Sequence, residues 1–455
     1  MRDFLPPMQS LTAEQNEALR CPLKKTMVAT GPPGSGKTVI ALYRTNILQK
    51  SKKKIDLVVY GRVLQKYLQT AIQEIEVDGA KIEAQTFYSW FPKFYKKITG
   101  ERPPEIERWF YDWDIILKKF AAMDVPKVFD HLIIDEGQDL PNDFFKWTPY
   151  ISNTVTVFAD ENQAIFQATN ASIKNIINAL ESFEPKIIEL TKNHRNTAET
   201  AKFANMFATK GIKTGMTELP TRKGSKPMLR QLSKWEEQVE PIKIWLDNNP
   251  NHQIGIFCEH TKAVDKWVKK IKEIFDKASG ITIQSYNSKR RREPLPDFSS
   301  DRTITVLTTW SAKGLEFDTV FVPDLESYED SVETVMRCYV SFSRPVERLI
   351  LSYVGTKYPS ILAKKISRED IEDFVETAGQ PDNAATLREL LTELRQRTDG
   401  KINSGDFNYI QVNLAVVVSP TDRMTRKELI ALMEKMLPDL FGKKVIPEVK
   451  KVWPY

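Results

Sequence analysis

The chain has 455 residues, of which 41% are hydrophobic and 28% charged, and a formal net charge of +6. This balance is typical of a globular protein with more than one core, and the length suggests about three domains. No apolar run reaches the length of a membrane span, and the first ten residues lack the apolar centre of a secretory signal, so we expect a cytoplasmic protein without a membrane partner. Three widely spaced cysteines and four histidines exclude a disulfide framework and leave no visible metal cluster.

The first 190 residues alternate short apolar runs with helical patterns. This alternation predicts an α/β domain with a parallel sheet, because buried parallel strands appear as short β-rich apolar runs. The strands that we expect are Thr26–Thr30, Ile55–Tyr60, Lys81–Gln85, Leu132–Ile134, Thr154–Ala159 and Lys186–Leu190. The segment from Phe91 to Met123 departs from the alternation, and we interpret residues 91–128 as a small helical insertion.

A phosphate-binding loop follows the first expected strand. The run Gly31-Pro32-Pro33-Gly34-Ser35-Gly36-Lys37-Thr38 fits G-x-x-x-x-G-K-[ST] in full, and a helix is expected over Val39–Gln49. In such a loop, backbone N–H groups and the helix N-terminus surround phosphate oxygens. The pattern predicts that Lys37 reaches the β- and γ-phosphates of ATP and that Thr38 holds Mg²⁺.

Paired acids end the expected strand at Leu132–Ile134. Beside a phosphate loop, the first acid, Asp135, would anchor Mg²⁺ through water, and Glu136 would act on the attacking water as general base. An acidic pair alone is usually a solvated turn, so this interpretation depends on the preceding phosphate loop.

A second α/β domain is expected over residues 191–366. Its predicted strands are Met228–Leu232, Gln253–Cys258, Ile281–Ser285, Thr303–Thr308, Thr319–Val322 and Arg348–Ser352, with helices over Trp235–Asp247 and Thr261–Phe275. Residues 367–455 predict an appended α-rich extension, with helices over Leu387–Arg397 and Thr425–Leu437 and a strand over Tyr409–Val418. The extension carries no motif, and it is a candidate site for a protein partner.

The motifs that follow the phosphate loop resemble, in order, those of superfamily one DNA helicases of the UvrD/Rep type. The acidic motif is Asp135-Glu136-Gly137-Gln138-Asp139. The others are Thr12–Ala18, Leu57–Arg62, Gln85–Trp90, Val157–Phe166, Leu190–Asn196, Thr308–Asp318 and Arg337–Arg344. The resemblance covers about residues 10 to 355 and implies two RecA-like domains in tandem with ATP in the cleft between them.

The resemblance also implies roles for individual residues. The ATP site would include Gln15, Gly31, Gly34, Ser35, Gly36, Lys37, Thr38, His194, Gly314 and Glu316. The catalytic residues would be Lys37, Asp135, Glu136 and Gln163, together with Arg195 and Arg344 as arginine fingers. The nucleic-acid contacts would be Tyr60, Arg62, Thr86, Phe87, Trp90, Phe166, Thr309 and Trp310; their aromatic rings would suit base stacking.

The chain departs from the family pattern at several positions. His194 replaces the Tyr that stacks on adenine, and Val39 stands where an Arg often contacts the base. Ala168 stands where a stacking Trp is typical, and Trp310 where a His is usual. The large second insertion of the full-length family appears absent, so translocation along a strand is better supported than processive unwinding.

The sequence therefore predicts an ATP- and Mg²⁺-dependent translocase or helicase on single-stranded nucleic acid, with DNA preferred to RNA and 3′ to 5′ polarity implied by the resemblance alone. One alternative is a nucleotide-gated clamp or regulatory ATPase subunit of a larger assembly. Another is a P-loop kinase or small-molecule ATPase, which would leave the motifs of the second domain unexplained.

Overall fold

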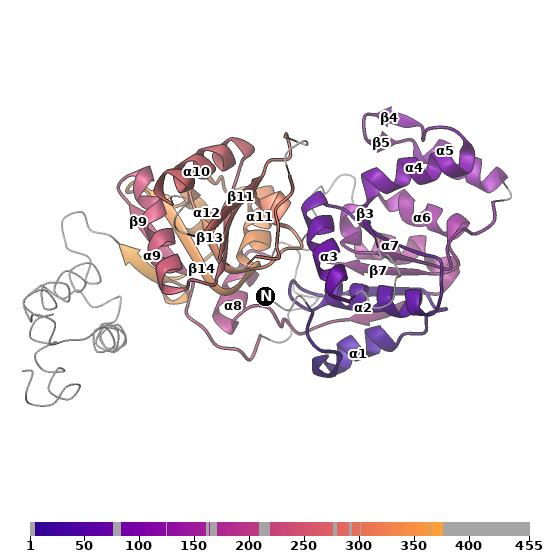
Figure 1. Cartoon of the computed structure of the whole chain (residues 1–455), viewed down its shortest axis with the longest axis horizontal. Helices are drawn as coiled ribbons and strands as arrows, with labels where there is room; N and C mark the ends of the chain where they lie inside the picture. Colours follow the sequence, from indigo (N-terminus) through magenta and orange to yellow (C-terminus); the bar gives the residue numbers. More distant parts are fainter. Residues whose placement is uncertain are drawn as a thin grey trace, which may run out of the picture. The chain divides into compact units, whose positions relative to one another are not determined.

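Two parallel β-sheets, each with helices packed around it, follow one another along the chain (Figure 1). The computed structural model describes residues 5–75, 83–123, 125–160, 163, 171–208, 219–275, 280–290, 294–300, 302–363 and 365–375. These residues fall almost entirely within one unit, Met1–Asp373. The elements expected after residue 375 lie outside the described residues.

The first sheet has the strand order β3-β2-β6-β7-β1-β8, and all of its neighbouring strands are parallel. In that order the strands are Ala84–Thr86, Ile55–Val59, His131–Ile134, Val155–Ala159, Met27–Thr30 and Lys186–Glu189. The helices of this part are α1 Ala13–Arg20, α2 Lys37–Lys50, α3 Arg62–Ile75, α4 Phe87–Thr99, α5 Trp113–Ala122, α6 Asn142–Ile151 and α7 Ile173–Ala179. The central strands β1, β6 and β7 are fully buried, as expected when helices cover both faces.

The second sheet has the order β11-β12-β10-β13-β14-β9-β15. In that order the strands are Thr282–Tyr286, Thr303–Thr308, Gln253–Cys258, Phe317–Val322, Pro345–Val354, Met228–Leu232 and Glu372–Val375. The accompanying helices are α8 Ala198–Asn205, α9 Glu240–Asn248, α10 Thr261–Ile274, α11 Val332–Phe342 and α12 Ser360–Ala363. Each strand expected before residue 367 is confirmed, with bounds that differ by a few residues, whereas the strand expected over Tyr409–Val418 lies outside the described residues. The division of the chain at residues 190 and 366 stays a prediction.

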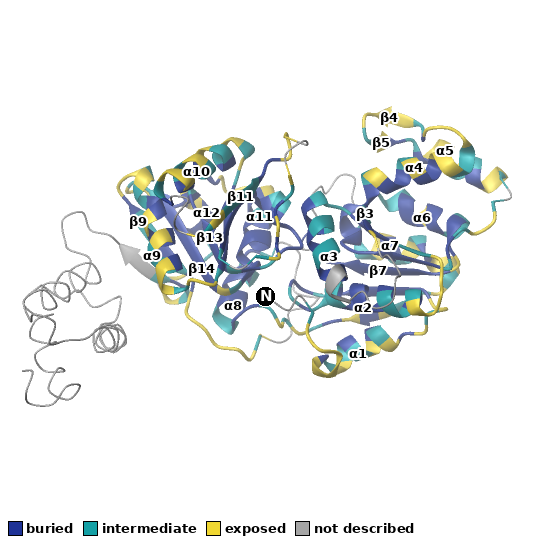
Figure 2. Ribbon diagram, viewed as in Figure 1, coloured by how far each residue is buried: buried dark blue, intermediate teal, exposed yellow. Residues whose placement is uncertain are grey.

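The segment interpreted as a helical insertion contains more than helices. Between α4 and α5 lie two short antiparallel strands, β4 Glu105–Glu107 and β5 Phe110–Tyr111, which form a hairpin. The expected helices are present as α4 and α5, and the hairpin between them was not expected. The helices flanking the hairpin bury an aromatic cluster in which Phe87, Phe91 and Trp147 are completely covered (Figure 2).

A buried histidine makes the stability of the first sheet dependent on pH. His131, in β6, is fully buried; its Nε2 lies 2.7 Å from Thr156 Oγ1, and its Nδ1 lies 2.7 Å from Thr154 Oγ1. Burial, with a smaller contribution from Arg44, lowers the pKa of His131 to about 3. Below pH ~6.5, His131 therefore binds a proton in the unfolded chain but not in the folded chain, so the folding stability falls as the pH falls.

We predict that lowering the pH from 7.5 to 5.5 costs about 1.4 kcal/mol of folding free energy through His131 alone. Urea unfolding at the two pH values measures this loss, and His131→Gln should reduce the difference. The exposed His260 provides the control: His260→Gln should leave the pH dependence unchanged, and an equal effect of both substitutions would contradict the assignment.

Candidate functional site

The loop between β1 and α2 has the backbone geometry of a phosphate cradle. Gly34 and Gly36 have φ angles of 76° and 89°, in the left-handed region that glycine enters without strain. A Cβ on Gly31 would lie 2.4 Å from the carbonyl oxygen of Leu190, so that position has no room for a side chain. Lys37 is buried and spans the loop, with Nζ donating to Gly31 O at 2.6 Å and to Pro32 O at 2.9 Å.

The loop also offers unsatisfied polar atoms. Among the residues that the structure describes, Ser35 Oγ is buried without a hydrogen-bond partner. Thr38 Oγ1 donates to Asp135 Oδ2 at 2.8 Å, which places a hydroxyl and a carboxylate oxygen together at the start of α2. Oxygen ligands of this kind suit Mg²⁺, and the cradle suits phosphate, so the residues present fit both groups.

Gln15 connects α1 to the phosphate loop. Its side-chain oxygen accepts from Thr12 N at 3.0 Å, while Thr12 Oγ1 accepts from Gln15 N, and together they form a capping box at the start of α1. The Gln15 amide nitrogen donates to Ser35 O at 2.9 Å. The predicted adenine-reading glutamine therefore lies beside the loop and is held by it.

The paired acids differ in their electrostatics. Burial, reinforced by the neighbouring Glu136, raises the pKa of Asp135 to about 7. Burial alone would also raise the pKa of Glu136, but the nearby cations Lys313, Lys37 and Arg344 lower it below its ordinary value. Glu136 is therefore held as a carboxylate, and Gln138 Nε2 donates to its Oε2 at 2.6 Å.

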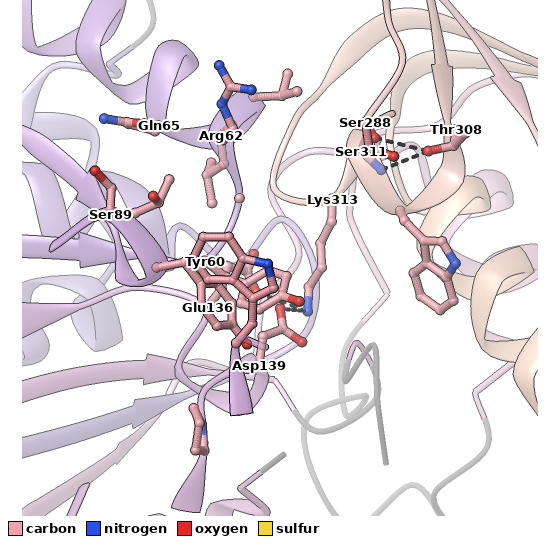
Figure 3. Close-up of a pocket in the computed structure, with 18 of the residues that line it drawn as sticks. Tyr60, Arg62, Gln65, Ser89, Glu136, Asp139, Ser288, Thr308, Ser311 and Lys313 are labelled. Atoms are coloured by element: carbon pink, nitrogen blue, oxygen red, sulfur yellow. Dashed lines mark hydrogen bonds and ion pairs between the residues drawn. The ribbon is translucent and has the colours of Figure 1, made fainter. Parts of the chain in front are cut away.

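Lys313 crosses from the second sheet to the acids of the first (Figure 3). Its Nζ donates to the carboxylate of Asp139 and to the carbonyl oxygen of Gln163, and lies 3.7 Å from Glu136 Oε2. Lys313 is only 6% exposed. A cation of the second part of the chain thus lies inside the acidic site of the first.

Arg344 makes a second buried connection between the two sheets. Its Nη2 donates to Gln163 Oε1, and Gln163 Nε2 donates to Asp160 Oδ2 at 2.5 Å. The Asp160 carboxylate lies 3.9 Å from Lys37 Nζ. Arg344 is therefore linked to Lys37 through two intervening side chains.

Arg195 approaches the phosphate loop from the segment after β8. A Cβ built on Gly34 would lie 2.7 Å from Arg195 Cβ, and His194 N donates to Gly34 O at 2.8 Å. Arg195 Nε donates to Glu316 Oε2 at 3.0 Å. The predicted residues His194, Arg195 and Glu316 thus gather beside the loop.

Gly314 lies against α3. A Cβ on Gly314, whose φ is 77°, would lie 2.7 Å from Leu64 Cδ1. Close by, the rings of Tyr67 and Phe298 meet edge to face with centroids 5.5 Å apart. Both parts of the chain therefore share an apolar contact in addition to the buried ion pairs.

A groove of about 2480 Å³ runs between the two sheets, next to the acidic site. Residues of both parts line it, including Tyr60, Arg62, Glu136, Asp139, Thr308, Trp310 and Lys313 (Figure 3). Glu136 and Lys313 thus belong to both the acidic site and the groove wall.

The predicted nucleic-acid contacts separate into groups. Tyr60, Arg62, Thr86 and Trp310 line the groove, and the Arg337 guanidinium lies over the Trp310 ring, 5.1 Å from its centroid. Thr309 is fully buried beside them. Phe87 and Trp90 are 0% and 3% exposed and pack in the aromatic cluster, where Trp90 Nε1 donates to Asp56 Oδ2. Phe166 and Ala168 lie outside the described residues.

Three site residues were missing from the set selected from the sequence. Asp139, Asp160 and Lys313 complete the buried polar network, and each lies inside a motif already quoted for the resemblance. The signal that could have identified them is a charged residue close to a buried strand, because a buried charge needs a partner.

Two parallel sheets, with a phosphate loop in the first and cations of the second reaching its acids, define a helicase-like α/β protein. Residues 24–323 match the family model described as Schlafen group 3, DNA/RNA helicase domain. The chain belongs to this family.

Individual relatives share the helicase description at low identity. A protein of Acanthamoeba polyphaga mimivirus, named a putative ATP-dependent DNA helicase, is 26% identical over 270 residues, which cover 54% of this chain and 37% of the relative. DNA helicase II of Haemophilus influenzae is 32% identical over 80 residues, 17% of this chain and 11% of that protein. The chain thus matches well under half the length of either relative.

One solved structure with similarity is the C-terminal domain of a possible DNA helicase from Lactobacillus plantarum WCFS1. It is 18% identical, with a TM-score of 0.30, and the match covers 40% of this chain and 99% of that one.

We predict that Lys313→Met lowers the folding stability by about 3–5 kcal/mol, because it removes the buried cation that Asp139 contacts and one of the three cations near Glu136. Thermal and urea unfolding measure the loss. The exposed pair Lys146–Asp143, with atoms 2.6 Å apart, is the matched control: Lys146→Met should cost no more than about 1 kcal/mol. Equal losses of stability in the two variants would show that the buried ion pair contributes no more than the exposed one.

Proposed function

We propose that this chain is a superfamily one helicase-like motor, of the UvrD/Rep type, that hydrolyses ATP between its two sheets and moves along single-stranded nucleic acid in the groove. The observation that supports this most is Lys313, which contacts the acidic site and lines the groove. A nucleic-acid strand in the groove and a nucleotide at the phosphate loop would both act on Lys313. The family assignment and the helicase relatives support the same class.

The proposed chemistry follows the charges of the site. Lys37 and the loop amides would bind the phosphates, and Thr38 with Asp135 would hold Mg²⁺, which supplies neutralising charge to the phosphate oxygens. Glu136, kept ionised by its cationic neighbours, would accept a hydrogen bond from the attacking water and orient it. Arg195 and Arg344 would stabilise the charge that develops on the transferred phosphoryl group.

A single strand is the proposed substrate because the groove carries aromatic rings and cations together. Bases present π-faces to aromatic rings irrespective of sequence, and phosphates pair with Lys and Arg. DNA in preference to RNA, and movement from 3′ to 5′, rest on the resemblance and on the names of the relatives. The limits 1–190, 191–366 and 367–455 are retained as the proposed domains.

A nucleotide-gated clamp is the second candidate, and one observation favours it. The buried contacts Lys313–Asp139 and Arg344–Gln163 already join the two parts of the chain. If they persist throughout the nucleotide cycle, the groove would hold a strand without advancing it.

In the described residues, no helix is both long and apolar enough to cross a bilayer.

ATP hydrolysis with and without oligothymidylate separates these functions. We predict that a single strand stimulates hydrolysis, and that Lys37→Ala and Glu136→Gln each reduce turnover by about 10²-fold or more. Lys146→Met serves as the exposed control and should behave as the unchanged chain. Tight binding of the strand without turnover would support the clamp and contradict the motor.

We predict that Arg344→Ala retains ATP binding but loses about 10²-fold or more in turnover, because the developing phosphoryl charge loses its cation. Fluorescent-nucleotide binding and steady-state hydrolysis measure the two effects. Arg348 is a matched buried arginine in β14, paired with Glu372 rather than with the acidic site. Arg348→Ala should keep its turnover per folded molecule; full turnover in Arg344→Ala would contradict the assigned role.

A further inference from the structure

The hairpin of β4 and β5 presents apolar side chains at the edge of the groove. Ile106 and Phe110 are 73% and 53% exposed, and both line the groove together with Trp109. Exposed apolar residues scattered singly are ordinary. Two of them on one short hairpin, beside the half-buried Trp109 and lining the same groove, form a patch that suits a ligand.

The hairpin is fixed to the core. Tyr111, next to Phe110 in β5, is 4% exposed, and its ring lies 4.7 Å from that of Phe91, between centroids. Asp112 N donates to Pro104 O at 2.9 Å and closes the base of the hairpin. The exposed tip is therefore held at a definite place on the groove wall.

The turn of the hairpin contains a strained tryptophan. Trp109 has a φ of 75°, where glycine or asparagine is expected and a bulky residue costs about 1–3 kcal/mol. The Trp109 ring meets Tyr88 edge to face at 5.8 Å between centroids, and Tyr88 meets Tyr60 in the same manner at 6.0 Å. All three residues line the groove and form a series of rings along its wall.

The charges of the groove favour a polyanion. The carboxylates that line it are already paired: Glu136 and Asp139 with Lys313, Glu259 with Arg337, and Asp143 with Lys146. Further cations line the same groove, namely Arg62, Lys93, Lys262 and Lys289. A ligand that combines flat apolar rings with phosphates matches this surface.

We propose that the Glu105–Tyr111 hairpin guides a single strand into the groove, with the Trp109 ring stacking on one base and Ile106 and Phe110 packing against the neighbouring bases. This inference rests on the proposed function and adds to it an element outside the helicase motifs. A single strand is preferred to a duplex because only unpaired bases expose faces to stack on Trp109.

The test measures the affinity of the full chain for fluorescein-labelled oligothymidylate by anisotropy. Trp109→Gly removes the ring and relieves the left-handed strain, so the melting temperature should change little while Kd rises roughly ten-fold or more, as for the loss of one stacked base. Trp109→Phe should recover most of the affinity.

Two controls make the outcome decisive. Tyr358 is an exposed aromatic residue outside the groove, so Tyr358→Ala should leave Kd unchanged; Ile106→Ser, at an exposed position, should weaken binding without loss of folding. If the unchanged chain binds the oligonucleotide and Trp109→Gly binds equally well, the hairpin inference is wrong while the motor stands. An equal loss of affinity for a blunt duplex would overturn the preference for a single strand, and failure of the unchanged chain to bind any strand would remove both proposals.

Discussion

The arrangement of the site depends on the contacts that the buried ammonium of Lys313 makes with the acids. This ammonium neutralises Asp139, lies close to Glu136 and donates a further hydrogen bond to the carbonyl oxygen of Gln163. Two adjacent buried carboxylates without a cation would be expensive, since burial strongly disfavours the charged forms. The second sheet thus supplies the charge that the first sheet needs, and the two parts of the chain are joined by that requirement as well as by the apolar contact of Leu64 with Gly314.

The same requirement gives the two acids different chemistry. Burial and the neighbouring Glu136 raise the pKa of Asp135, although the hydrogen bond from Thr38 opposes the shift. Glu136 lies within reach of Lys313 and Arg344, which keep it charged. This difference suits the roles proposed for them, with Asp135 beside Mg²⁺ and Glu136 beside the attacking water. Pairs of carboxylates whose environments separate their pKa values are a recurring feature of acid–base sites.

The sequence predicted the strands well because fully buried parallel strands form short β-rich runs, as at Val155–Ala159. It also predicted the phosphate loop and the paired acids, because the residues within each of these motifs are neighbours in the sequence. Lys313 and Asp139 are 174 residues apart, and no local pattern indicates that they meet. The hairpin escaped prediction because β4 and β5 contain only three and two residues, too few to show a periodic pattern, and β4 is exposed at every position. Periodicity also cannot distinguish an aromatic residue in the core, such as Phe87, from one that lines the groove, such as Tyr60.

The crossing from the first sheet to the second begins at the phosphate loop itself. Leu190, which follows β8, leaves no space beyond Gly31, and His194 holds Gly34 through the backbone. The segment that connects the two sheets is thus held, where it begins, against the loop proposed to bind phosphate. A rearrangement of a few tenths of an ångström in this loop would act on the segment that leads into the second sheet. A small rotation of that segment would displace the far edge of the second sheet by a larger distance.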